Sequence, residues 1–170
     1  MEIMNTVAEL MALAARTAPK ASGQDFLAVK VVSGNDLKTL GQEMENYGVE
    51  TGKKNFDRDG RNVAASDALL LLALQQPKTV GLNCGACGQP KCAMLESKEG
   101  PEFTGPLCAW RLMDIGIAVG SAVKTASLLN ADNRVMYRVG VVAKKLGIIE
   151  GEIVIGIPIS ATGKSIFFDR

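Results

Sequence analysis

Four cysteines gathered in one short stretch are the residues of this chain best suited to chemistry. They follow the spacing Cys-x2-Cys-x4-Cys-x15-Cys, as Cys84, Cys87, Cys92 and Cys108. Two intervening residues let one tight turn aim two thiolates at a common metal centre. Gly85 and Gly88 let backbone amides approach the sulfurs, where N–H donors stabilise a negatively charged cluster. The pattern predicts one metal site with four thiolate ligands, and it favours a 4Fe–4S cluster.

Three other interpretations of these cysteines stay open. A four-thiolate zinc site would be purely structural, although such sites are usually built from two close pairs and here the last cysteine stands alone. Thiol–disulfide exchange at Cys84 and Cys87 would leave the other two cysteines without a role. The four residues could also be ordinary reduced thiols that happen to cluster.

Histidine is absent from the 170 residues. Its absence excludes Ser-His-Asp and Cys-His catalysis, histidine-ligated zinc and haem held by histidine. The cysteines are therefore the main candidates for any chemistry that this chain performs.

Composition indicates a globular protein with an ordinary core, since 47% of the residues are hydrophobic and 22% are charged. We expect residues 1–170 to form a single domain in which residues 82–108 are a cluster-binding insert. The net charge of +1 provides no strong field for nucleic acid or an anionic membrane, so neither is expected as a partner. No apolar stretch is long enough to span a membrane, and Glu2 comes first in the amphipathic N-terminal stretch. A cytoplasmic location with reduced thiols is expected.

Hydrophobic periodicity predicts several elements in the first half of the chain. Residues 2–17 have the spacing of an amphipathic helix, and the β-branched run at 26–32 indicates a buried strand. A further helix is expected from Asp36. The apolar run at 68–74 favours a buried central strand, whereas the polar stretch at 52–62 indicates an exposed turn or a frayed helix end.

The second half is expected to begin with the cysteine-rich insert, which is too rich in glycine and proline to order itself by burial. A long helix should follow Cys108, apolar over a wide arc and buried on several sides. Asp132 or Asn133 is expected to cap another helix, which ends at Gly147. The last strand is expected to stop at Pro158.

The cysteine motif resembles that of known electron-transfer proteins. The run Cys84-Gly-Ala-Cys87-Gly-Gln-Pro-Lys-Cys92, with Cys108 as a fourth cysteine, is similar to the small 4Fe–4S module of certain anaerobic proteins. These include the corrinoid iron–sulfur proteins and the ferredoxin-like subunits of membrane-bound redox pumps. The resemblance covers the motif alone and implies that the four cysteines are the cluster ligands.

The flanking segments resemble the nitroreductase-like flavoproteins. Residues 18–19 after a helix, 114–118 in the long helix, and 146–148 followed by 154–158 are similar to that family's opening, central helix and closing strand. Taken whole, the chain resembles the uncharacterised ferredoxin-domain proteins of anaerobes, in which a nitroreductase-like scaffold carries a cysteine insert. This resemblance implies an α+β fold, a mixed sheet flanked by helices, and a homodimer.

The same resemblance implies FMN as a second cofactor. Gln24 lies in the loop that meets the flavin in that family, and Lys164 lies where a late basic residue contacts the phosphate. The alternative is that Arg16, Lys20 and Lys164 are solvated surface charges.

These observations predict an iron–sulfur protein in electron transfer or an oxidoreductase reaction, with or without a flavin and with an unidentified redox partner protein. Both an electron carrier and an oxidoreductase enzyme fit the pattern. The alternative is a non-catalytic binding or sensor module in which the metal, 4Fe–4S or zinc, only orders residues 82–108. Trp110, near Cys108, either shields the cluster or simply packs.

Overall fold

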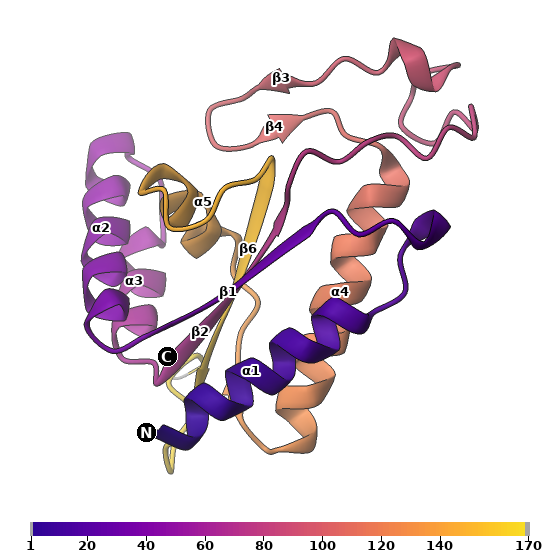
Figure 1. Cartoon of the computed structure of the whole chain (residues 1–170). Coiled ribbons are helices and arrows are strands. Elements are labelled where there is room, and N and C mark those ends of the chain that lie inside the picture. Colours follow the sequence, from indigo (N-terminus) through magenta and orange to yellow (C-terminus); the bar gives the residue numbers. More distant parts are fainter. Residues whose placement is uncertain (1, 169–170) are drawn as a thin grey trace.

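A four-stranded antiparallel sheet lies at the centre of the computed structural model, which describes residues 2–168 (Figure 1). Its strands, in spatial order, are β1 (Leu27–Ser33), β2 (Ala68–Leu74), β6 (Ile153–Ser160) and β5 (Asp132–Asn133). Two helices cover one face of the sheet: α1 (Glu2–Thr17) and α4 (Ala109–Leu128). Three cover the other: α2 (Asn35–Thr51), α3 (Phe56–Ala64) and α5 (Tyr137–Lys145). The short elements are η1 (Ala21–Gly23), η2 (Cys92–Met94), β3 (Lys98–Glu99) and β4 (Thr104–Gly105).

The strand β2 is the centre of both hydrophobic layers. All seven of its residues are buried. Successive side chains of a strand point to opposite faces, so Leu70 and Leu72 pack against α1 and α4, whereas Leu69 and Leu71 pack against the other helices. Because helices cover both faces of β2, its residues do not alternate between apolar and polar side chains. The predicted buried central strand is confirmed.

The predicted α+β class is confirmed, and the helices at 2–17 and from Asp36 and the strand at 26–32 form close to their expected bounds. In the described part of the chain every pairing within the central sheet is antiparallel, where a mixed sheet was expected. Since β1 and β6 both pair antiparallel with β2, they run in the same direction. The start of β1 and the end of β6 therefore lie at opposite ends of the sheet.

The expectation of an exposed turn at 52–62 was wrong, because α3 occupies most of this stretch. Phe56 and Val63 are fully buried against α2. The two helices approach closely at Gly41 and Gly60, where a Cβ on Gly41 would lie 2.5 Å from the carbonyl oxygen of Gly60. A few buried positions and a glycine contact are enough to order a short helix that is otherwise polar.

Two expected boundaries near the C-terminal end were also wrong. Asp132 and Asn133 pair with the end of β6 instead of capping a helix, and α5 begins at Tyr137. The strand β6 continues through Pro158. This proline faces β5, where its carbonyl accepts from the Arg134 backbone N–H at 3.4 Å, so its missing donor falls on the side of the short edge strand.

Helix α4 is buried on one side only within a single chain, although burial on several sides was expected. Alanines at 118, 122 and 126 pack in the layer shared with α1, while Met113 and Ile117 are exposed. Despite these exposed apolar groups, none of the helices in residues 2–168 combines the length and apolar character needed to cross a membrane.

The chain between β2 and α4 projects beyond one end of the sheet (Figure 1). Its regular structure is limited to η2 and the two-residue strands β3 and β4, and most of its residues are exposed. As expected from its composition, this segment forms little regular structure. It returns to the core at Cys108, directly before α4.

Candidate metal centre

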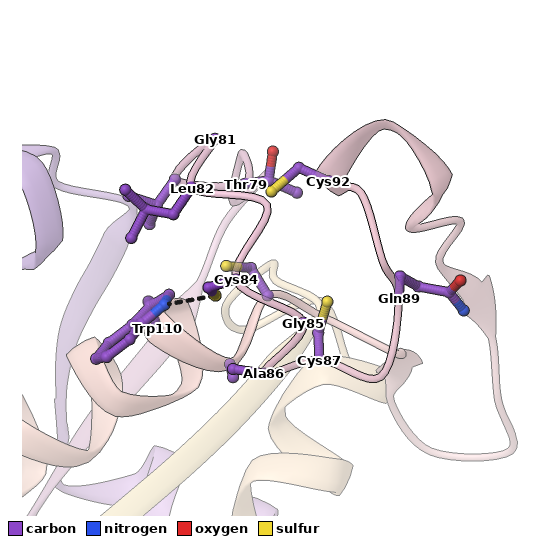
Figure 2. A pocket seen from close by; sticks show the side chains of 13 residues that line it. Thr79, Gly81, Leu82, Cys84, Gly85, Ala86, Cys87, Gln89, Cys92 and Trp110 are labelled. Carbon is purple, nitrogen blue, oxygen red and sulfur yellow. Dashed lines mark hydrogen bonds between the residues drawn. The ribbon is translucent and has the colours of Figure 1, made fainter.

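All four cysteines line one small pocket, between the loop at 79–92 and the first turn of α4 (Figure 2). Three of them belong to the loop, and Cys108 is the residue that precedes α4. The fold therefore brings a buried residue of the scaffold next to cysteines that lie far from it along the chain. It places the predicted ligands together, while metal binding by them stays a prediction.

A tight turn separates the first two cysteines. Gly85 and Gly88 have φ angles of 75° and 86°, in the left-handed region that favours glycine. The Gly88 N–H donates to the Gly85 carbonyl at 2.9 Å and closes the turn. The turn places Cys84 and Cys87 on the same pocket, as the two-residue spacing predicted.

Several N–H groups point at the sulfurs. The Asn83 backbone N–H donates to Cys92 Sγ at 3.3 Å. Trp110 Nε1–H donates to Cys84 Sγ at the same distance (Figure 2). The Ala86 backbone N–H, followed by the Trp110 donor, holds the pKa of the Cys84 thiol below its ordinary value. These donors favour the thiolate, which is the form that binds metal. Trp110 therefore does more than pack.

Asn83 is a site residue to which the sequence analysis gave no role. Its Oδ1 accepts from the Cys92 backbone N–H at 2.8 Å, while its own backbone N–H donates to the Cys92 sulfur. Its φ of 49° is left-handed, a conformation that asparagine tolerates better than most residues. An asparagine directly before the first cysteine was the available signal.

The sulfurs share the pocket without forming a coordination shell. All four cysteines are free thiols. Within residues 2–168, no group of three or more His, Cys, Asp or Glu side chains is arranged closely enough to hold a metal ion. Cys84 is exposed, Cys87 and Cys92 are half-buried, and Cys108 is only 8% exposed. Metal binding would therefore need the thiols to come closer together.

The two candidate FMN residues lie far apart in a single chain. Gln24 precedes β1, and its Oε1 accepts from Arg111 Nη2 at 2.6 Å. Lys164 follows the end of β6. The sheet separating these two ends spans about 20 Å. One chain does not bring Gln24 and Lys164 to a common site.

Sequence comparisons find two relationships. The family described as "Uncharacterized protein containing a ferredoxin domain (DUF2148)" matches residues 104–170, a range that includes Cys108 and follows the other three cysteines. A protein of Archaeoglobus fulgidus, described as "Uncharacterized protein", is 44% identical over 171 residues. That alignment covers 99% of this chain and 92% of the relative.

Structure comparisons find nitroreductases. Nitroreductase CinD from Lactococcus lactis, in complex with chloramphenicol, aligns with a TM-score of 0.64 at 14% identity over 95% of this chain and 79% of that one. A nitroreductase with bound FMN from Desulfitobacterium hafniense has a TM-score of 0.61 at 15% identity, over 94% and 79%. Nitroreductase A from Vibrio parahaemolyticus scores 0.57 at 12% identity, and the alignment covers 94% of this chain but only 60% of that protein. The fold is nitroreductase-like, and at these identities the likeness extends to the fold alone.

Proposed function

The chain belongs to the family of uncharacterised proteins that contain a ferredoxin domain, and we propose that it is an iron–sulfur protein that transfers electrons through a 4Fe–4S cluster. A ferredoxin domain in itself suggests an iron–sulfur cluster. The observation that carries the proposal is the pocket lined by all four cysteines, three from a loop and one from the start of α4. Cys84, Cys87, Cys92 and Cys108 are the proposed ligands.

The donor set fits such a cluster. Iron–sulfur clusters are commonly held by four cysteine thiolates and stabilised by hydrogen bonds to sulfur. Asn83 and Trp110 already donate to two of the sulfurs. When bound, the cluster supplies one-electron oxidation and reduction. Cys108, a buried residue directly before α4, fixes the site to the scaffold. The exposed Cys84 marks the side from which a redox partner protein would approach.

Metal analysis of protein purified without oxygen tests the proposal. We expect a brown protein that contains iron and acid-labile sulfide in equal amounts and that bleaches on reduction. Stoichiometric zinc without visible absorption would overturn the electron-transfer role and favour the alternative, a binding or sensor module whose metal only orders residues 82–108.

Single substitutions test the ligand assignment. Each of the four Cys→Ser variants is expected to lower the iron content. The sharpest case is Cys108→Ser, because this residue is buried and comes from a different segment than the other three. Full iron retention in Cys108→Ser would show that the fourth ligand is assigned wrongly.

A homodimer is the second part of the proposal. Exposed apolar side chains occupy the outer surface of the α1–α4 layer, and they are Ile3, Leu10, Leu13, Leu112, Met113 and Ile117. Apolar surface of this kind is commonly covered by a second subunit. We expect sedimentation to give a dimer, Ile117→Glu to give a monomer, and Val49→Glu on exposed α2 to leave the dimer intact. A monomeric wild-type protein would remove this part of the proposal.

FMN binding through Gln24 and Lys164 is a subordinate proposal that depends on the dimer. Because one chain holds these residues at opposite ends of its sheet, a shared FMN would need one residue from each copy. Saturation with FMN followed by heat release tests this directly. Retention of flavin that is lost in Gln24→Ala and Lys164→Ala supports it, whereas no retained flavin leaves electron transfer to the cluster alone.

A further inference from the structure

Arg111 is fully buried, with 0% of its surface exposed, in the first turn of α4. A charged side chain is costly to bury unless it is paired and its hydrogen bonds are satisfied. Its position is notable for the site, since it lies three residues after Cys108. The contacts of its guanidinium group therefore show what this buried charge holds together.

The guanidinium group joins two segments that are distant in sequence. Nε donates to the Lys78 carbonyl at 2.8 Å, on the chain that leaves β2 toward the cysteine loop. Nη1 donates to the Ala21 carbonyl at 3.0 Å, and Nη2 donates to Gln24 in the loop before β1. The group also lies 4.7 Å from the centre of the Phe26 ring. Arg111 thus connects the entrance of the cysteine loop, the loop around η1 and the start of α4.

Asp114 neutralises this charge locally. Its Oδ2 accepts from Arg111 Nη1 at 3.0 Å, and its Oδ1 accepts from the Ala21 backbone N–H at 2.8 Å. The pair is therefore electrically balanced within one turn of the helix. What Arg111 adds at the cysteines is directional hydrogen bonding, because a planar guanidinium group donates along fixed directions.

We propose that Arg111 is a positioning residue for the metal centre, which sets the place of the Cys84–Cys92 loop relative to Cys108. This inference rests on the proposed function, in that the four cysteines must bind metal. Cys84, Cys87 and Cys92 lie on the chain segment that follows Lys78, which Arg111 contacts. The fourth cysteine, Cys108, lies three residues before Arg111. One rigid side chain therefore controls how far the thiols must move to meet.

The opposite face of the sheet offers a matched control. Arg138 on α5 pairs with Asp59 on α3 at 2.9 Å, and Asp59 is only 1% exposed. Arg138 contacts Asp59 and the rings of Phe56 and Tyr137, which all belong to the helices on this face of the sheet. Arg111→Met and Arg138→Met each remove an arginine from a buried aspartate, and Asp59 then keeps Arg58 at 2.8 Å. Only Arg111→Met removes contacts beside the metal centre.

The experiment titrates Cd²⁺ into the reduced full-length protein and follows the thiolate-to-cadmium absorption, with urea unfolding measured in parallel. We expect Arg111→Met to weaken Cd²⁺ binding by about 10–100-fold. Arg138→Met is expected to destabilise the fold while it changes Cd²⁺ binding by less than about twofold. A ferrous chelator should also strip a reconstituted cluster faster from Arg111→Met than from Arg138→Met.

Two further variants keep the test decisive. Arg111→Lys retains the charge but not the fork of donors, so it should bind Cd²⁺ nearly as weakly as Arg111→Met. Gln24→Leu removes one acceptor and keeps the Arg111–Asp114 pair, so it should fold and show a smaller weakening even if Arg111→Met does not fold.

The inference is overturned if folded Arg111→Met binds Cd²⁺ like the wild type, if Arg111→Lys restores binding, or if Arg138→Met weakens binding equally. If Arg111→Met does not fold, unchanged Cd²⁺ binding by Gln24→Leu overturns it. A wild-type protein that binds neither Cd²⁺ nor iron contradicts the proposed function itself.

Discussion

The central strand β2 and the cysteine loop that follows it are held in place by different forces. Every residue of β2 is buried, and its leucines pack into helices on both faces of the sheet. From residue 81 to residue 94 the chain has no buried residue, and Leu82 is 60% exposed. Burial of apolar surface orders the first region, whereas the second depends on a few polar contacts and, in our proposal, on a metal.

Polar contacts hold the cysteine segment at two places, the pocket lined by the cysteines and the hairpin that follows it. At the pocket, Asn83 and Trp110 hold the loop through the sulfurs. At the outer hairpin, formed by β3 and β4, the Glu102 carboxylate accepts from the Tyr47 hydroxyl at 3.2 Å and pairs with Lys53. It thereby fastens the segment to the C-terminal end of α2. A segment held in this way can be changed at one point without unfolding the sheet.

The largest difference in stability between the two regions is expected when a leucine in each is replaced by alanine. Leu71→Ala removes a fully buried side chain from β2 and should lower the free energy of unfolding by about 2–5 kcal/mol. Leu82→Ala in the loop should change it by less than about 0.5 kcal/mol. Urea unfolding measures both, and similar losses would show that the loop is part of the cooperative core.

Removal of the metal should affect only the cysteine segment. In the metal-free protein we expect amide hydrogen exchange at residues 83–95 to rise by about tenfold or more, because the metal contributes its binding energy to the order of the loop. The amides of β2 serve as the internal control and should keep their protection. Equal loss of protection in β2 would mean that the scaffold also depends on the metal.

A smaller effect is expected from Trp110→Phe, which keeps an aromatic ring but removes the N–H donor to Cys84. An N–H donor stabilises the more negative, reduced cluster, so its loss should lower the reduction potential. A hydrogen bond worth about 1 kcal/mol corresponds to about 40 mV for one electron. Potentiometry checks this, with the exposed Met113→Leu as a control that should not shift the potential.

The smallest effect is expected at the outer hairpin. Burial first, and then the Glu102 carboxylate, raises the pKa of Tyr47 above its ordinary value. Glu102→Gln removes that negative charge, so the pKa of Tyr47 should fall, while the free energy of unfolding changes by less than about 1 kcal/mol. Tyrosinate absorption against pH tests the direction, and Glu99→Gln on exposed β3 should leave the Tyr47 titration unchanged.

Local patterns in the sequence were sufficient for much of the fold. Helix α1, strand β1, helix α2 and strand β2 all form where periodicity and apolar runs placed them, because each signal repeats over several turns or residues. The cysteine spacing predicted one shared metal site. The four cysteines do line one pocket, while metal binding there stays a prediction. Family membership was also recognisable from short motifs.

Contacts between distant segments decided the rest. Helix α3 forms because Gly41 and Gly60 let two helices touch, and β6 continues through Pro158 because the missing donor faces a short edge strand. The roles of Asn83 and Arg111 depend on partners that the fold brings to them. Sequence spacing determines which residues can share a turn or a face, but only the tertiary structure determines which buried polar group finds a partner, since that partner lies far away along the chain.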